Sequence, residues 1–166
     1  VLSRDYYVHK GFARELTLTH PAHSRYQGRG DYGLVDGIRG SRNHADGSWS
    51  GFLGEDMVAV IDLGEATRIE GIELDALQAA GSWIFLPERV RFEVSADGEQ
   101  FSLLDELSHS YSPYKSERFI HVFASSKPAD NVRYLRVTAE NPGECPPGHS
   151  GEGRPAFIFL SEIVVN

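Results

Sequence analysis

The chain has 166 residues, with 16 Lys and Arg against 24 Asp and Glu, which gives a formal net charge of −8. This is the length of one domain, and it is long enough to bury a sizeable core without disulfides or a metal merely to fold. The basic residues are outnumbered and scattered, so the clustered Lys and Arg that bind nucleic acid are absent from the sequence. No apolar run approaches the ~18 residues of a membrane span, and no membrane insertion is expected.

The ends of the chain and its single cysteine bear on disulfide formation, export and domain boundaries. Cys145 has no second cysteine for a disulfide, and its neighbours Pro146 and Pro147 predict a loop. The chain begins at Val1 without the charged and apolar regions of a signal peptide, so its beginning leaves export open. The last strand runs to the end of the sequence. We therefore expect residues 1–166 to form one domain excised from a larger multidomain protein.

Short runs of alternating apolar and polar residues, separated by turn residues, predict an all-β domain. Asp97-Gly98 predicts a tight hairpin between two of these runs, and Gly64-Glu65-Ala66 is expected to separate another pair of strands. The expected strands number eight, which predicts a jelly-roll or similar β-sandwich. They cover residues 15–20, 57–63, 68–77, 89–95, 101–107, 117–123, 131–139 and 156–165.

Four long loops are the expected location of any function. Loops of this length are uncommon in a compact domain unless they bind something, and these hold most of the Gly, His and Trp residues. They are residues 20–56, 78–87, 108–116 and 141–155.

The catalytic and nucleotide motifs in the sequence lack their structural context. Residues 28–33 match G-x-G-x-x-G, but neither the strand before it nor the helix after it is predicted. This segment also contains the tripeptide Arg29-Gly30-Asp31, which is too short to indicate a function. His20 and His23 flank Pro21, which breaks the helix that would align them on a metal.

A self-contained enzyme has little support, because no nucleophile elbow or Cys–His arrangement is present. The chain is therefore predicted not to be an enzyme by itself. A free-standing hydrolase using Glu55, Asp56 or Glu152 with His149 is kept as an alternative.

Two segments, residues 34–52 and 148–163, combine several chemical requirements. Asp36 lies in a predicted turn, where its carboxylate and nearby backbone carbonyls are the hard oxygen ligands that calcium prefers. Glu162 interrupts an otherwise apolar strand, and a buried carboxylate needs a partner. From the residues alone, the favoured interpretation is that Asp36 caps its own turn and Glu162 points to solvent.

The ordered set of motifs resembles the coagulation factor V/VIII type C (discoidin) domains, which include many bacterial carbohydrate-binding modules. The motifs are Leu34-Val-Asp-Gly-Ile-Arg-Gly40, Trp49-Ser-Gly-Phe52, and residues 58–64, 69–72, 94–101, 133–137 and 160–163. More narrowly, residues 84–87 and 148–159 resemble the version at the C-terminus of bacterial family 20 glycoside hydrolases, the β-N-acetylhexosaminidases. The resemblance implies an eight-stranded jelly roll of the galactose-binding-like type, a structural calcium ion, and a glycan site in loops at one end.

Carried over by position, the resemblance implies a calcium loop tied to the last strand. The implied ligands are the carboxylates of Asp36 and Glu162, the carbonyls near Gly33 and Ile38, the hydroxyl of Ser41 and the carbonyl of Ser161. Such an ion would be structural, because it would join an early loop to the end of the chain.

Glycan binding needs an aromatic face for the apolar side of a sugar ring and polar groups for its hydroxyls. Trp83, which follows Gly-Ser in a loop, is the expected platform, whereas Trp49 is expected in the core. The other expected ligand-binding residues are Gln78, His44, Phe52, Tyr111 and His149. The compact His, Arg and Asn set of galactose-type binders is missing, so a structural spacer without a sugar site is an open alternative.

The sequence therefore predicts a non-catalytic accessory module of an exported bacterial glycoside hydrolase. Its expected partners are a glycan with a terminal neutral or N-acetylated sugar and the catalytic domain of the parent chain. The expected location is the periplasm, the cell surface or the extracellular space.

Overall fold

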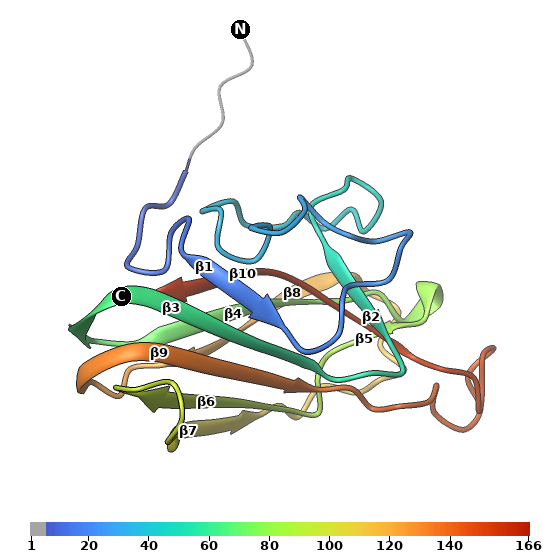
Figure 1. Cartoon of the computed structure of the whole chain (residues 1–166). Helices are drawn as coiled ribbons and strands as arrows, with labels where there is room; N and C mark the ends of the chain where they lie inside the picture. Colours follow the sequence, from blue (N-terminus) through green and yellow to red (C-terminus); the bar gives the residue numbers. More distant parts are fainter. Residues whose placement is uncertain (1–5) are drawn as a thin grey trace, which may run out of the picture.

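A computed structural model describes residues 6–166 as a sandwich of two β-sheets (Figure 1). The expected domain 1–166 thus includes residues 1–5, which lie outside the described residues. One sheet has the order β1 (Glu15–Leu18), β3 (Met57–Ile69), β9 (Ala129–Glu140), β6 (Arg89–Ser95) and β7 (Ser102–Ser108). The other has the order β2 (Ser50–Leu53), β10 (Phe157–Val165), β4 (Ile72–Gln78) and β8 (Phe119–Ser125), with β5 (Ile84–Phe85) parallel to β10. The predicted all-β sandwich is confirmed.

The main core lies between the sheets and follows the period-two alternation of the strands. Along β3, Met57, Ala59 and Ile61 are fully buried, while the residues between them are partly exposed. Phe92 of β6 and Phe123 of β8 join this core from the two sheets. Alternation therefore places one face of each strand inside the sandwich, as the sequence pattern predicts.

The pairing expected across Gly64-Glu65-Ala66 is wrong. β3 runs without interruption from Met57 to Ile69, and Gly64 (φ 87°) lies in an irregular stretch where the register with β9 shifts. A bulge of this kind bends a strand without ending it. The chain turns only after Ile69, and β3 and β4 then lie in different sheets. The Asp97-Gly98 hairpin, in contrast, is confirmed, because β6 pairs with β7.

Two short strands, β2 and β5, were not expected from the sequence. β2 is defined by its pairing with β10, where Gly51 lies opposite Phe159. A Cβ atom on Gly51 would come within 2.6 Å of the Phe159 ring, so this position requires glycine. Neither strand has a local pattern long enough to be recognised, because tertiary contact with β10 creates them.

β10 is buried on both faces, which explains why its sequence is almost continuously apolar. Ile158 and Leu160 belong to the main core, whereas Phe159 lies in a second cluster with Trp49 and Leu77. The chain before β2 supplies Trp49 to this cluster, and Tyr26 packs against it. Over residues 6–166 the single helical turn is η1 (Ala80–Ser82), and no helix is long and apolar enough to cross a membrane.

Candidate functional site

Three of the four long loops meet at one end of the sandwich, on the right in Figure 1. The buried amide of Gln78, at the end of β4, donates to the carbonyl of Ser112 (2.8 Å). The hydroxyl of Tyr114 donates to the carbonyl of Pro147 (2.8 Å). These contacts join residues 108–118 to the end of β4 and to the loop between β9 and β10.

A hollow of about 300 Å³ lies where these loops meet. Its apolar walls include Phe85, Leu86 and Tyr111, and its polar walls include Gln78 and His109. Three prolines complete it, Pro113, Pro142 and Pro146. Proline fixes its own φ, so the walls are ordered before any ligand arrives and less conformational entropy is lost on binding.

The charged side chains that line this hollow are carboxylates. Glu88 and Glu144 lie on its wall, and no Lys or Arg of residues 6–166 does. Burial lowers the pKa of His109, an effect that the charge of Glu88 partly offsets, so the imidazole is mostly neutral near pH 7. The hollow therefore offers an aromatic ring, an amide, an imidazole and two carboxylates, and the ammonium of Lys115 lies beside it, 5.9 Å from the centroid of the Tyr111 ring.

Tyr111 is the exposed aromatic residue of the hollow, with 42% of its surface accessible. Its ring packs against Phe119 (centroids 4.8 Å apart) and His121 (5.2 Å), both on β8. These contacts hold the ring in place while leaving part of it accessible to a ligand.

Trp83, the expected platform, is half-buried and packs against the loop between β9 and β10. A Cβ atom on Gly151 would lie 2.7 Å from the indole, so the backbone of Gly151 covers part of the ring. The guanidinium of Arg154 lies 5.6 Å from the ring centroid. Trp83 is outside the lining of the hollow and contributes to the packing between two of its loops.

His149 also joins two loops by hydrogen bonds. Its Nδ1 accepts from the backbone N–H of Gly151 (3.1 Å), so its Nε2 carries the proton and donates to the carbonyl of Ala80 (2.9 Å). Both ring nitrogens are thus used by the backbone. Glu152, which was paired with His149 in the hydrolase alternative, accepts from the N–H of Gly148, and this arrangement favours a structural role for both.

His44 and Phe52 do not join the other expected ligand-binding residues. Phe52 is 1% exposed in the main core, so the expectation that it contacts a glycan is wrong. Alternation along β2 turns its ring inward. His44 packs against Phe159 (centroids 6.5 Å apart), away from the hollow. Trp49, expected in the core, is confirmed there.

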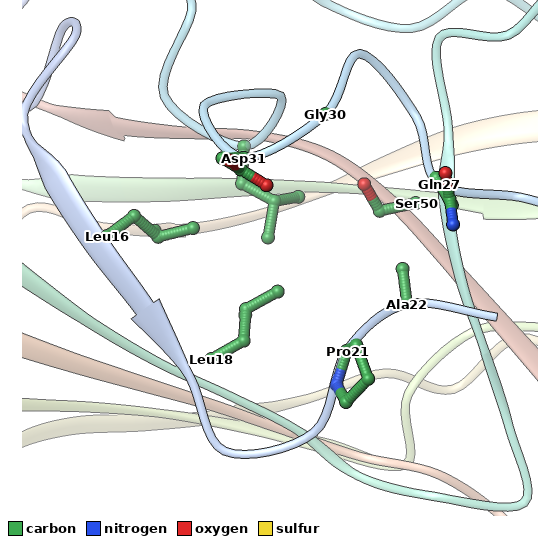
Figure 2. A pocket seen from close by; sticks show the side chains of 9 residues that line it. Leu16, Leu18, Pro21, Ala22, Gln27, Gly30, Asp31 and Ser50 are labelled. Carbon is green, nitrogen blue, oxygen red and sulfur yellow. The ribbon is translucent and has the colours of Figure 1, made fainter. Parts of the chain in front are cut away.

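A second hollow, of about 190 Å³, lies between β1 and the chain that follows it. Figure 2 shows Leu16 and Leu18 of β1 pointing into it, with Asp31 and Ser50 on the other side. None of the expected ligand-binding residues lines it. Its walls are mainly aliphatic and offer no aromatic face for a sugar ring.

The loop expected to bind calcium is organised around Arg29. Its guanidinium makes a bidentate ion pair with Asp36 and also donates to the carbonyl of Ile38. It donates further to the carbonyls of Gly33 (3.2 Å) and Ser48 (2.9 Å). Three of the six implied calcium ligands, the oxygens of Gly33, Asp36 and Ile38, thus lie close together. The guanidinium of Arg29 lies at their centre.

Two of the other three implied ligands, the Ser41 hydroxyl and the Glu162 carboxylate, have separate partners. The hydroxyl of Ser41 donates to Asp46. The third implied ligand is the carbonyl of Ser161, and the hydroxyl of the same residue accepts from the N–H of Gly40 (3.0 Å). Glu162, fully buried, accepts through Oε1 from the N–H of Gly37 (2.9 Å) and bonds His9 (2.9 Å), which answers the question of its partner.

Burial raises the pKa of Glu162, although the hydrogen bonds from His9 and Gly37 act in the opposite direction. Its Oε2 has no hydrogen-bond partner among the described residues. Within residues 6–166, no group of three or more His, Cys, Asp or Glu side chains is placed to hold a metal ion. The oxygens of the loop, as arranged, fit a guanidinium and do not fit a second cation.

Comparison with known proteins gives the fold. No family model and no curated protein match the sequence. Among solved structures, chitosan-binding module 1 of a chitosanase/glucanase from Paenibacillus sp. IK-5 matches with a TM-score of 0.57 at 12% identity, covering 95% of this chain and 96% of the module.

Two modules of Clostridium perfringens match similarly. CBM32-1 from a family 31 glycoside hydrolase has a TM-score of 0.53 at 17% identity, covering 95% of this chain and 97% of that one. CpGH89CBM32-4, solved with GlcNAc-α-1,4-galactose, has a TM-score of 0.52 at 15% identity, covering 99% and 97%. The chain therefore has the β-sandwich fold of carbohydrate-binding modules found in glycoside hydrolases.

Proposed function

We propose that the chain is a non-catalytic carbohydrate-binding module, with its glycan site in the hollow between the three loops. The observation that carries this proposal is the combination of an accessible aromatic ring, Tyr111, with polar groups on ordered walls. An aromatic face suits the C–H side of a pyranose, and an imidazole and carboxylates suit its hydroxyls. The fold shared with carbohydrate-binding modules supports the same assignment.

The charges of the hollow support a neutral or N-acetylated sugar. Glu88 and Glu144 would repel sialic acid and other anionic sugars, and the ammonium of Lys115, beside the Tyr111 ring, offsets part of that repulsion. The net charge of −8 on the chain also repels anionic sugars. A screen should therefore contain N-acetylglucosamine, galactose and fucose termini, sialylated glycans, and glucosamine oligomers, whose ammonium groups the carboxylates would also accept.

We further propose that the domain serves a larger, exported bacterial glycoside hydrolase. The motifs in residues 84–87 and 148–159 support a family 20 β-N-acetylhexosaminidase as that enzyme. The module would raise the effective concentration of its enzyme at a polymeric or cell-surface substrate, so weak affinity at a single site is sufficient.

A glycan array with the isolated domain, followed by calorimetry on the strongest ligand, tests the binding site. We expect Tyr111→Ala to weaken binding at least about tenfold, since loss of one ring contact costs ~1.4 kcal/mol or more. Tyr32→Ala removes a tyrosine of another loop that is more exposed than Tyr111 (54% against 42%) and should leave affinity unchanged.

The spacer alternative has its own support, because the Gln78 amide and the Trp83 ring are both engaged in loop packing. A folded domain that binds no member of the array would favour the spacer. Binding that is lost in Trp83→Ala and retained in Tyr111→Ala would contradict the proposed hollow and move the site to the indole.

A further inference from the structure

The oxygen atoms around Arg29 have the chemistry of a cation-binding site. The carboxylate of Asp36 and the carbonyls of Gly33, Ile38 and Ser48 all point at one guanidinium. Converging carbonyl dipoles and a carboxylate need a positive charge at their centre, because their mutual repulsion is otherwise unbalanced. Arg29 supplies that charge, and it is permanent because guanidinium does not deprotonate in proteins.

The backbone is shaped to bring Arg29 to this position. Gly28 (φ 59°) and Gly30 (φ 83°) flank it with left-handed conformations, and Gly33 donates its N–H to the carbonyl of Gly30 (2.9 Å). A Cβ atom on Gly33 would lie 2.9 Å from the backbone nitrogen of Arg29. The tight turn reverses the chain so that the side chain of Arg29 enters its own loop.

The Arg29 site is partly buried and linked to the rest of the fold. The side chains of Arg29 and Asp36 are 15% and 20% exposed. Gly37 and Gly40, which follow Asp36, donate their N–H groups to Glu162 and Ser161 in the middle of β10. The cation thus organises a loop that binds directly to the last strand.

We propose that Arg29 takes the place of a metal ion in this loop, so that the domain is stable without calcium. A calcium ion needs six to eight oxygens at about 2.3–2.6 Å. The oxygens of Asp36, Gly33 and Ile38 are already bonded to the guanidinium, and a second cation among them would be repelled by its charge. The inference does not depend on glycan binding.

The wild-type domain gives the first test. We expect its melting temperature to be the same in excess chelator and in millimolar calcium, and we expect no saturable heat in a calcium titration. Stabilisation by calcium, or binding that Asp36→Asn or Glu162→Gln removes, would overturn the proposal. Glu162 is included because its Oε2 is unpartnered among the described residues.

Arg29→Ala gives the second test. In chelator we expect its melting temperature to fall by about 5 °C or more, since the oxygens lose their only shared cation. Calcium should restore part of this loss in the variant alone, by occupying the vacated oxygens. Arg25→Ala, which removes an exposed arginine from the same part of the chain, is the matched control and should behave as the wild type.

Two outcomes for the Arg29→Ala variant would contradict the proposal. An Arg29→Ala domain as stable as the wild type in chelator would show that the guanidinium does not organise the loop. A destabilised variant that calcium fails to rescue would show that the oxygens are not a cation site. If Arg29→Ala does not fold, the wild-type titration still decides whether calcium binds.

Discussion

At the scale of single residues, Asp75 of β4 is an acidic side chain that is buried away from water. It is 1% exposed and accepts a hydrogen bond from Arg39 (2.5 Å), which also pairs with Glu73. Burial raises the pKa of Asp75, Arg39 lowers it, and the charges of Glu73 and Glu162 raise it, with a net pKa of about 6. Desolvation is the larger effect.

This pKa predicts a pH dependence of stability. The folded state holds a proton on Asp75 below about pH 6, whereas the unfolded chain releases it above its ordinary value of 3.8. Between these values the folded state binds more protons, so lowering the pH through this window stabilises it and raising the pH destabilises it. Asp75→Asn should remove this dependence, a difference of roughly 2–3 kcal/mol between pH ~4 and ~7.

Urea unfolding of the wild type and Asp75→Asn at several pH values measures this difference. Glu99→Gln, which changes an exposed carboxylate of the β6–β7 hairpin, is the matched control. Parallel stability profiles for the wild type and Asp75→Asn would contradict the prediction.

Residue identity alone predicted part of the candidate site. Gln78 and Tyr111 were expected to bind ligand and do line the hollow, whereas Phe85, Glu88 and His109 were missed. The missed residues have no motif, because they become neighbours only when the ends of different strands meet. Trp83 and His149 lie in the adjoining loop contacts. An exposed-looking residue in a loop can thus be covered by a second loop that local sequence does not reveal.

At the scale of elements, the segment before β2 packs against β10 through the buried ring of Trp49. Trp49 is 1% exposed, and its indole N–H donates to the carbonyl of Ser41 (2.9 Å). A Cβ atom on Gly40 would lie 2.4 Å from this indole. The loop therefore needs glycine at position 40 for packing and not for an unusual backbone conformation.

Gly40→Ala should destabilise the domain by about 1–3 kcal/mol, because the added methyl group overlaps a buried ring that cannot move freely. Gly81→Ala is the matched control, since a Cβ atom there meets nothing within 4 Å. Thermal unfolding of both variants measures the effect. Equal melting temperatures would show that the loop moves away from Trp49 at little cost.

The elements themselves were largely predictable. The hairpin of β6 and β7 and the buried strand β10 follow from alternation and from Asp97-Gly98. β2 and β5 were not, since both exist through pairing with β10. The irregular stretch at Gly64 was mistaken for a turn because glycine permits both, and only the partner strand distinguishes them.

At the scale of the whole molecule, the described residues form a β-sandwich in which several groups named for the hydrolase alternative bond the backbone. Both ring nitrogens of His149 bond the backbone, and the Asp56 carboxylate accepts from the N–H of Asn141 (2.8 Å). Asp56, Glu152 and His149 of the hydrolase alternative are therefore engaged in holding loops, whereas Glu55 is exposed to solvent.

The isolated domain should not hydrolyse glycosides. Aryl glycosides of N-acetylglucosamine, galactose and fucose, incubated with the domain and followed by release of the aryl group, provide the measurement. Turnover above the buffer rate that is lost in His149→Ala, with the variant still folded, would restore the hydrolase alternative. The His20→Ala variant, which changes an exposed histidine, is the control.

The sequence by itself determined the fold class, the approximate position of the long core strands and the location of the long loops. These follow from local patterns, since a period of two residues places one face of each strand in the core. Only the tertiary structure decided which loops meet and which cation lies among the oxygens of the Asp36 loop. The convergence of Gly33, Asp36, Ile38 and Ser48 on Arg29 depends on the path of the backbone in space, which residue spacing does not encode.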